Sequence, residues 1–171
     1  MRFRNRSPLK VIALIGVAIV VMAGLALATP GSGVTPGPLT RAAFVDDVAI
    51  KFKFEMPGGA KEIANLGDPS EVVTQEITFA AGGHTGWHSH PGPVIVQVRS
   101  GTLTYYAGDD PTCTGHDYST GEAFMDPGRG HVHIARNEQA DPLTIVAIYF
   151  DVPTGASPRI DVTPAPGNCP F

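Results

Sequence analysis

Short runs of β-branched and aromatic residues, each ended by a turn that contains Gly or Pro, follow one another from residue 71 to residue 150. The run 71–79 (EVVTQEITF) stops at a Gly-Gly turn, and the run 143–150 (LTIVAIYF) is the longest apolar one. Between them, 94–98 and 102–106 flank Ser100-Gly101, as the two strands of a hairpin do. Short strands at this spacing predict an all-β fold, a sandwich or a barrel.

Weaker patterns complete this prediction. Further short strands are expected at 49–55, 122–125 and 132–135, and the first of these alternates as an edge strand does. Helix is limited to a turn or two near residues 61–66. The 20 Gly and 16 Pro among 171 residues favour turns over a helical bundle, while 43% hydrophobic residues are too many for a disordered chain. We therefore expect one folded domain over residues 39–171.

The N-terminus has the composition of an export signal. Arg2, Arg4, Arg6 and Lys10 precede an uncharged apolar stretch, 11–28, that ends in Ala-Leu-Ala. This pattern predicts a signal peptide cleaved after Ala28, and its length also allows an uncleaved membrane anchor. In both cases the domain is extracytoplasmic, either secreted or anchored through residues 11–28. Residues 29–38 (TPGSGVTPGP) are predicted to be a flexible linker.

Charge limits the partners of the folded part. Four of the 12 basic residues lie in the first 28 residues, which contain none of the 16 acidic ones. The remainder is strongly acidic, which argues against nucleic-acid binding. Contact with a membrane is expected only through the N-terminal segment.

Cys113 and Cys169 are the two cysteines of the chain. An even number of cysteines in an exported protein favours a disulfide, and this one would tie the C-terminal tail to the domain. Two unrelated thiols are the alternative interpretation.

The histidines carry the chemical signal. Five of the six fall into two clusters: His84, His88 and His90 in GGHTGWHSHPGP, and His131 and His133 in DPGRGHVHIARN. Because residues two apart on a strand point to the same face, each His-x-His pair can face one cavity. Neutral imidazoles suit first-row transition metals such as Fe, Mn, Ni, Cu or Zn rather than Mg or Ca. We therefore expect one such ion, held by three imidazoles, although solvent-facing histidines would share this pattern.

The spacing of these residues resembles that of the cupin superfamily. Gly82, His88, His90 and Gly101 are similar to its first motif, and Gly121, Pro127, His133 and Asn137 to its second. The resemblance covers residues 71–150. It implies a small jelly-roll β-barrel with His88, His90 and His133 as metal ligands in its mouth. Pairing of two barrels into a homodimer through an edge strand is also expected by resemblance.

The sequence departs from this pattern at two points. Val94 stands where the first motif has a Glu ligand, so the ligand set is neutral and a coordination position is open for water or an anionic group. The second motif has an extra residue in its Pro-Gly turn, which makes His131 a competitor of His133. His84 and His131 are the additional ligand candidates.

Residues for proton transfer are less well marked. Glu122 and Glu76 are the carboxylates within predicted strands near the motifs. One of Tyr105 and Tyr106 should face the barrel interior by strand alternation, and Tyr106 is included among the catalytic candidates.

Three functions are compatible with these observations. The first is a metal-dependent enzyme, an oxygenase or isomerase acting on a small oxygenated molecule. The second is a non-catalytic module that binds a small molecule, a sugar or the metal itself. The third is a structural protein of the cell envelope. Fold alone does not choose among them.

Overall fold

The computed structural model describes residues 30–56 and 59–171. The predicted signal peptide or anchor, residues 1–28, lies outside these residues. Within them, no helix has the length and apolarity to cross a membrane.

The described residues form strands and no helices, which confirms the all-β prediction. In chain order the strands are β1 (Ser32–Pro36), β2 (Thr40–Ala43), β3 (Ala49–Glu55), β4 (Lys61–Gly67), β5 (Glu71–His84), β6 (His88–Ser89), β7 (Val94–Ser100), β8 (Thr102–Ala107), β9 (His116–Ser119), β10 (Ala123–Asp126), β11 (His133–Arg136), β12 (Leu143–Val152) and β13 (Ile160–Asp161). The turn of helix expected near residues 61–66 is wrong, because this segment is β4 and pairs with β3 along its whole length.

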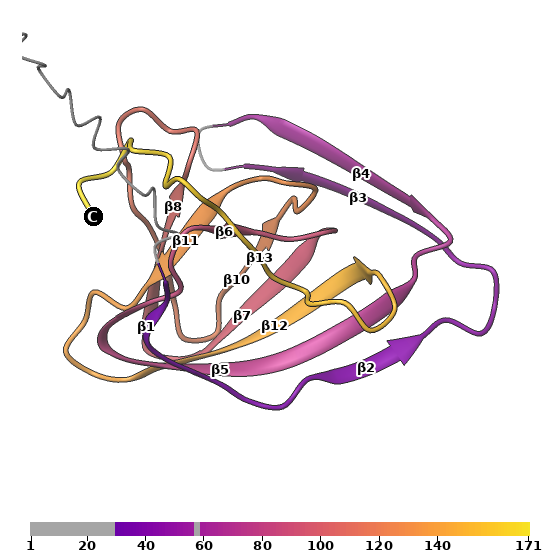
Figure 1. Ribbon diagram of the computed structural model, residues 1–171, viewed down its shortest axis with the longest axis horizontal. Coiled ribbons are helices and arrows are strands. Elements are labelled where there is room, and N and C mark those ends of the chain that lie inside the picture. Colours follow the sequence, from indigo (N-terminus) through magenta and orange to yellow (C-terminus); the bar gives the residue numbers. More distant parts are fainter. Residues whose placement is uncertain (1–29, 57–58) are drawn as a thin grey trace, which may run out of the picture.

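One large sheet curls into a nearly closed jelly-roll barrel (Figure 1). Its strand order is β10-β7-β12-β5-β11-β6-β13, with β8 attached to β11 and β9 to β8. β12 lies between β5 and β7 and pairs with β5 on one edge and β7 on the other. Its inward side chains alternate with outward ones, so Leu143, Ile145 and Ala147 are buried in the barrel core.

The N-terminal strands β1 and β2 follow one edge of β5, so the predicted flexible linker 29–38 differs from the structure. The free edge of β5 supplies backbone partners, and Gly37 N donates to Glu76 O at 2.8 Å. Val34 packs against the core. Pro is tolerated on such an edge strand because it lacks a backbone N–H, and the side of the strand that faces solvent needs none for the sheet. Ordering of this segment therefore comes from a partner strand far along the chain, which composition alone does not reveal.

β3 and β4 form a separate hairpin beside the barrel (Figure 1). The ring centroids of Phe52 in β3 and Phe150 in β12 lie 5.0 Å apart in an edge-to-face contact. The segment 49–55 is thus a strand as predicted, and its sheet has two strands.

The C-terminal tail is fastened to the barrel by the predicted disulfide, Cys113–Cys169. Cys169 is buried in a small second cluster with Trp87, Tyr106 and Ile134. This cluster lies on the side of β8 and β11 opposite the main core, because neighbouring residues on a strand face opposite ways.

Candidate metal centre

Strand pairing brings the two histidine clusters together. β6 and β11 are antiparallel, and His88 and His133 are direct partners in their ladder. His90 follows two residues after His88, so its side chain projects to the same side as that of His88. All three histidines are buried.

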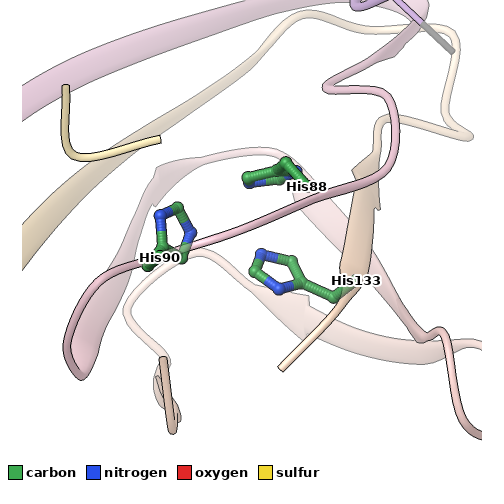
Figure 2. Close-up of side chains that lie close together, drawn as sticks. All are labelled: His88, His90 and His133. Atoms are coloured by element: carbon green, nitrogen blue, oxygen red, sulfur yellow. The ribbon is translucent and has the colours of Figure 1, made fainter. Parts of the chain in front are cut away.

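The three imidazole rings surround a common point (Figure 2). Ring centroids are 4.3 Å apart for His88 and His133, 4.9 Å for His88 and His90, and 5.1 Å for His90 and His133. One nitrogen from each ring lies within 4.8 Å of the others. The predicted set His88, His90 and His133 is therefore assembled at one place.

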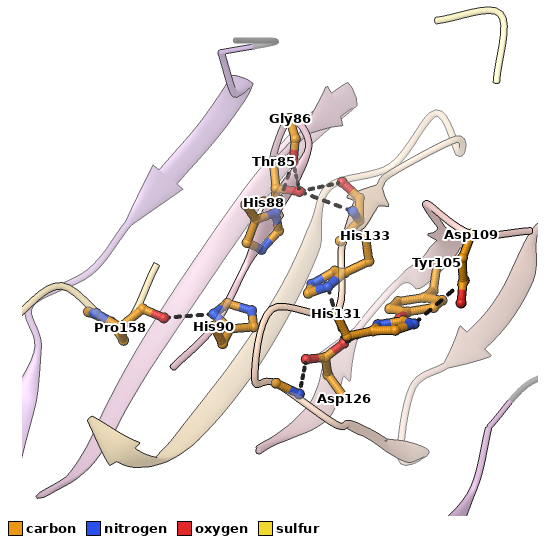
Figure 3. Close-up of polar contacts among 12 residues, drawn as sticks. Thr85, Gly86, His88, His90, Tyr105, Asp109, Asp126, His131, His133 and Pro158 are labelled. Carbon is orange, nitrogen blue, oxygen red and sulfur yellow. Dashed lines mark hydrogen bonds and ion pairs between the residues drawn. The ribbon is translucent and has the colours of Figure 1, made fainter. Parts of the chain in front are cut away.

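Backbone carbonyls determine which nitrogen of each ring faces this point (Figure 3). His88 Nδ1 lies 2.9 Å from Gly86 O, and His90 Nδ1 lies 2.7 Å from Pro158 O. A carbonyl oxygen only accepts, so Nδ1 carries the proton and donates it in both rings. The lone pair is then on Nε2, the nitrogen available to a metal.

Burial keeps the imidazoles of His88 and His90 neutral. Desolvation, followed by the nearby charges of His133 and His90, lowers the pKa of His88 well below 6.5. Desolvation and the neighbouring His133 lower the pKa of His90 to about 4. Neutral imidazole is the form that coordinates a metal ion.

Asp126, the first residue of the segment DPGRGHVHIARN, was not among the predicted site residues, yet it lies directly behind the three histidines. This carboxylate is 1% exposed, and its Oδ2 is 3.1 Å from His133 Nδ1. The distance suits a hydrogen bond but the direction does not, so His133 Nδ1 has no hydrogen-bond partner among the described residues. An acidic residue at an inward position of a short strand was the signal that could have identified it.

Tyr105 stacks on His133 and also contacts Asp126. The two rings are 5.2 Å apart with an interplanar angle of 22°, and the Tyr105 hydroxyl donates to Asp126 Oδ2 at 3.2 Å. Strand alternation correctly placed one of the two tyrosines inside. It is Tyr105, whereas Tyr106 faces the second cluster and donates its hydroxyl to Glu138 at 3.0 Å.

His131 lies behind the three-histidine group rather than in it. Its ring centroid is 6.4 Å from that of His133, and its Nδ1 is 3.4 Å from Asp126 Oδ2. Asp126, His131 and His133 form a second group that is close enough to share an ion. Burial lowers the pKa of His131, but its hydrogen bond to Asp126 and the charges of Asp126 and Asp109 raise it overall.

The remaining predicted site residues lie elsewhere. His84 is outside both groups, and its Nδ1 accepts from Gly86 N at 3.2 Å. Glu76 is an exposed residue of β5. Glu122 is exposed in the turn before β10, where it accepts from Ser119 N at 2.6 Å. None of these three side chains faces the imidazoles.

Two hollows adjoin the imidazoles. An internal cavity of about 40 Å³ is lined by the three histidines and by apolar core residues that include Val94. A larger pocket of about 430 Å³ lies over His88 and His90, between the N-terminal segment 30–39 and residues 157–161. Gln75, Tyr149 and Arg159 are among its polar lining residues. The three-histidine site is therefore reached from the mouth of the barrel.

The donor set fits a first-row transition metal. Three imidazoles converge, two of them oriented by carbonyls, and the third has a carboxylate next to its outer nitrogen. Because Val94 is apolar, the described side chains around the point provide nitrogen ligands and leave coordination positions open.

Residues 75–149 match the family model described as a cupin domain. A comparison with curated proteins finds no match. Among solved structures, the polyketide cyclase RemF from Streptomyces resistomycificus is 20% identical over 53% of this chain and 60% of the cyclase, with a TM-score of 0.44. A cupin domain from Bordetella pertussis Tohama I is 20% identical over 64% of this chain and 100% of that domain, with a TM-score of 0.42.

An oxalate oxidase in complex with the substrate analogue glycolate is 27% identical over 47% of this chain and 41% of the oxidase, with a TM-score of 0.40. The part matched by the family model runs from β5 to β12 and contains His88, His90 and His133. Residues 75–149 thus match a cupin domain, which supports the resemblance to the cupin superfamily that the two histidine motifs indicated.

Proposed function

We propose that this protein is an exported metal-dependent enzyme of the oxygenase type, acting on a small oxygenated molecule. The observation that carries the proposal is the convergence of His88, His90 and His133 beneath a pocket of about 430 Å³. Ligand pockets commonly combine such a volume with a few polar groups that orient the ligand.

His88, His90 and His133 would hold the ion through their Nε2 atoms. Bound there, a first-row transition metal supplies Lewis acidity and, for redox-active ions, chemistry with dioxygen. The apolar lining around Val94 excludes water from the inner side of the site. This apolar inner side favours chemistry with dioxygen over hydrolysis, because hydrolysis needs a positioned water.

Two side chains are suited to orient a substrate. The Arg159 guanidinium lines the pocket and offers a positive charge to anionic oxygens, although its Nε also contacts Asp161 Oδ1 at 2.7 Å. Burial raises the pKa of Tyr149 to about 12, so its hydroxyl keeps its proton and can donate a hydrogen bond. The Tyr149 and His90 ring centroids are 5.1 Å apart. A ligand bound in this pocket would thus lie next to the histidines.

A binding module without catalysis is the second candidate. It is favoured by the position of the carboxylates: Glu76 and Glu122 do not line the pocket, and Asp161, which does, is already paired with Arg159. The described lining therefore offers no free carboxylate as a general base.

Metal analysis of the untagged full chain tests the proposal. We expect about one equivalent of a first-row metal, lost in His88→Ala and kept in the control His84→Gln, whose side chain lies outside the site. The loaded protein should consume dioxygen with a panel of small carboxylates, diketones and thiols. Metal without turnover would favour the binding module. No metal in the wild type would refute the metal-dependent enzyme and leave a metal-free binding module or the structural role.

Export is supported by the Cys113–Cys169 disulfide, because such bonds persist mainly in oxidising compartments. Residues 1–28 would direct it, as a cleaved signal or as an anchor. Cell fractionation, followed by N-terminal sequencing, tests this. A reduced protein in the cytosol with its first 28 residues intact would contradict it. Homodimer formation stays a prediction, and sedimentation analysis would measure it.

A further inference from the structure

Asp126 occupies a position that gives it a direct relation to the proposed metal site. Its Cα is the antiparallel partner of Val94 in the ladder between β10 and β7. Direct partners in a ladder project to the same face of the sheet. The buried carboxylate therefore stands one strand away from the place where the cupin pattern has its Glu ligand.

This carboxylate is surrounded by donors. Its Oδ1 accepts from Gly128 N at 2.8 Å, and its Oδ2 accepts from the Tyr105 hydroxyl at 3.2 Å. The Nδ1 atoms of His131 and His133 lie 3.4 Å and 3.1 Å from the same Oδ2. All of these contacts suit an ionised carboxylate, which only accepts hydrogen bonds. Asp126 is thus a buried negative charge behind His133.

The turn after Asp126 is built to hold it there. Gly128 has a φ of +62°, and a Cβ on it would lie 1.8 Å from Gly92 O, two residues beyond His90. Only glycine permits this approach of the two backbones. The turn that presents the carboxylate and the segment that presents His90 are consequently packed against each other.

We propose that Asp126 is a positioning residue that sets the metal affinity of the three-histidine site through His133. Its carboxylate lies next to Nδ1 of His133 and supplies a negative charge, whereas Val94, at the place of the Glu ligand, supplies none. The inference rests on the proposed metal site. A negative charge 3.1 Å from His133 Nδ1 favours the proton on that nitrogen, and so leaves the lone pair on Nε2 and makes it more basic, although the two groups are not aligned for a hydrogen bond. Because the charge acts through His133, the coordination positions on the Val94 side stay open.

The experiment compares Zn²⁺ affinity of the full-length wild type and Asp126→Asn, measured by competition with a chromophoric chelator. Asn has nearly the same shape but lacks the charge. We expect a 10- to 100-fold weaker affinity with the stoichiometry still near one, in the range found when such outer partners are removed. Tyr105→Phe is the matched control: it removes a hydrogen bond to the same oxygen, keeps the charge, and should change the affinity less than threefold.

Restoring a carboxylate on the other strand separates charge from folding. Asp126→Asn combined with Val94→Glu should recover most of the lost affinity, and Asp126→Asn combined with Val94→Gln should not. Equal affinity of wild type and Asp126→Asn would overturn the inference and leave the metal site standing. A wild type that binds no Zn²⁺ would instead refute the proposed function.

Two further results bear on the assignment. If His131→Gln weakens binding as much as His133→Gln, the ion sits in the Asp126, His131 and His133 group, and Asp126 is a ligand rather than a positioning residue. If Asp126→Asn does not fold, the nitrogen NMR signals of wild-type His133 give the answer. Zn²⁺ should shift Nε2 and leave Nδ1 protonated, and the opposite assignment would overturn the inference.

Discussion

His88 and His133 are cross-strand partners of β6 and β11, with ring centroids 4.3 Å apart. Backbone pairing thus holds two of the three imidazoles close together. With His90 two residues along the same segment, the arrangement is largely built before any ion arrives, and little ordering energy is needed on binding.

Metal binding should therefore stabilise the folded protein without reorganising it. At a free Zn²⁺ concentration of 100 times the Kd, linkage predicts a gain of about 2.7 kcal/mol. Calorimetry with and without a chelator measures this gain as a shift in Tm. His133→Gln should abolish the shift, and His84→Gln should retain it. A shift that survives in His133→Gln would place the ion elsewhere.

The stability of the metal-free protein should fall between pH 6.5 and pH 4. The pKa of His90 is about 4 in the folded state and that of His88 is also lowered, so the unfolded chain binds more protons in this range. Their stabilising effect is present above about pH 6.5 and is lost as the pH falls, on the order of 3 kcal/mol for His90.

Urea unfolding at several pH values measures this dependence, and His90→Gln should make it shallower. His131 acts in a different window: its folded-state pKa is raised, so its contribution is present at low pH and is lost as the pH rises above about 6.5. A stability that is constant from pH 6.5 to pH 4 would show that the histidines are not buried as described.

Removal of the disulfide should destabilise the domain but spare the metal site. Cys113 and Cys169 are 56 residues apart, for which chain entropy predicts a cost of about 4 kcal/mol. The double variant Cys113→Ser/Cys169→Ser should show this loss in urea unfolding. Its Zn²⁺ affinity should remain close to that of the wild type, because the β6–β11 pairing joins His88 to His133, and His133 lies on the face of β11 opposite the one that packs on Cys169. A large loss of affinity would argue against this separation.

Asn137 is expected to be a strong determinant of stability. It is 1% exposed, its Nδ2 donates to Ala80 O at 3.1 Å and to Asp141 O at 2.8 Å, and its Oδ1 accepts from Gln139 N at 3.1 Å. Asn137→Ala leaves these groups without partners and should cost about 2–4 kcal/mol.

Asn168→Ala provides the comparison. Asn168 also bridges two carbonyls, those of Ala107 and Asp110, but it is only partly buried. Water can replace its hydrogen bonds, so we expect a smaller loss in thermal or urea unfolding. Equal losses for the two variants would refute the role of burial.

The alternation of strand residues made much of this site predictable. His88 and His90 share a face, and one of Tyr105 and Tyr106 faces inward, because side chains alternate along any strand. The apolar runs and their Gly and Pro turns likewise indicated the strands of the barrel. These are local properties, because each depends only on residues that are close together in the sequence.

Other features depended on contacts between distant segments. Asp126 was not predicted as a site residue, and its pairing with Val94 places it behind His133. Residues 32–36 lie in the predicted linker, and the edge of β5 gives them partners. Both His131 and His133 were open to the metal from spacing alone. The sequence by itself determined which side chains could act together, whereas strand register in the closed barrel decided which ones meet, because a shift of one residue turns every side chain to the opposite face.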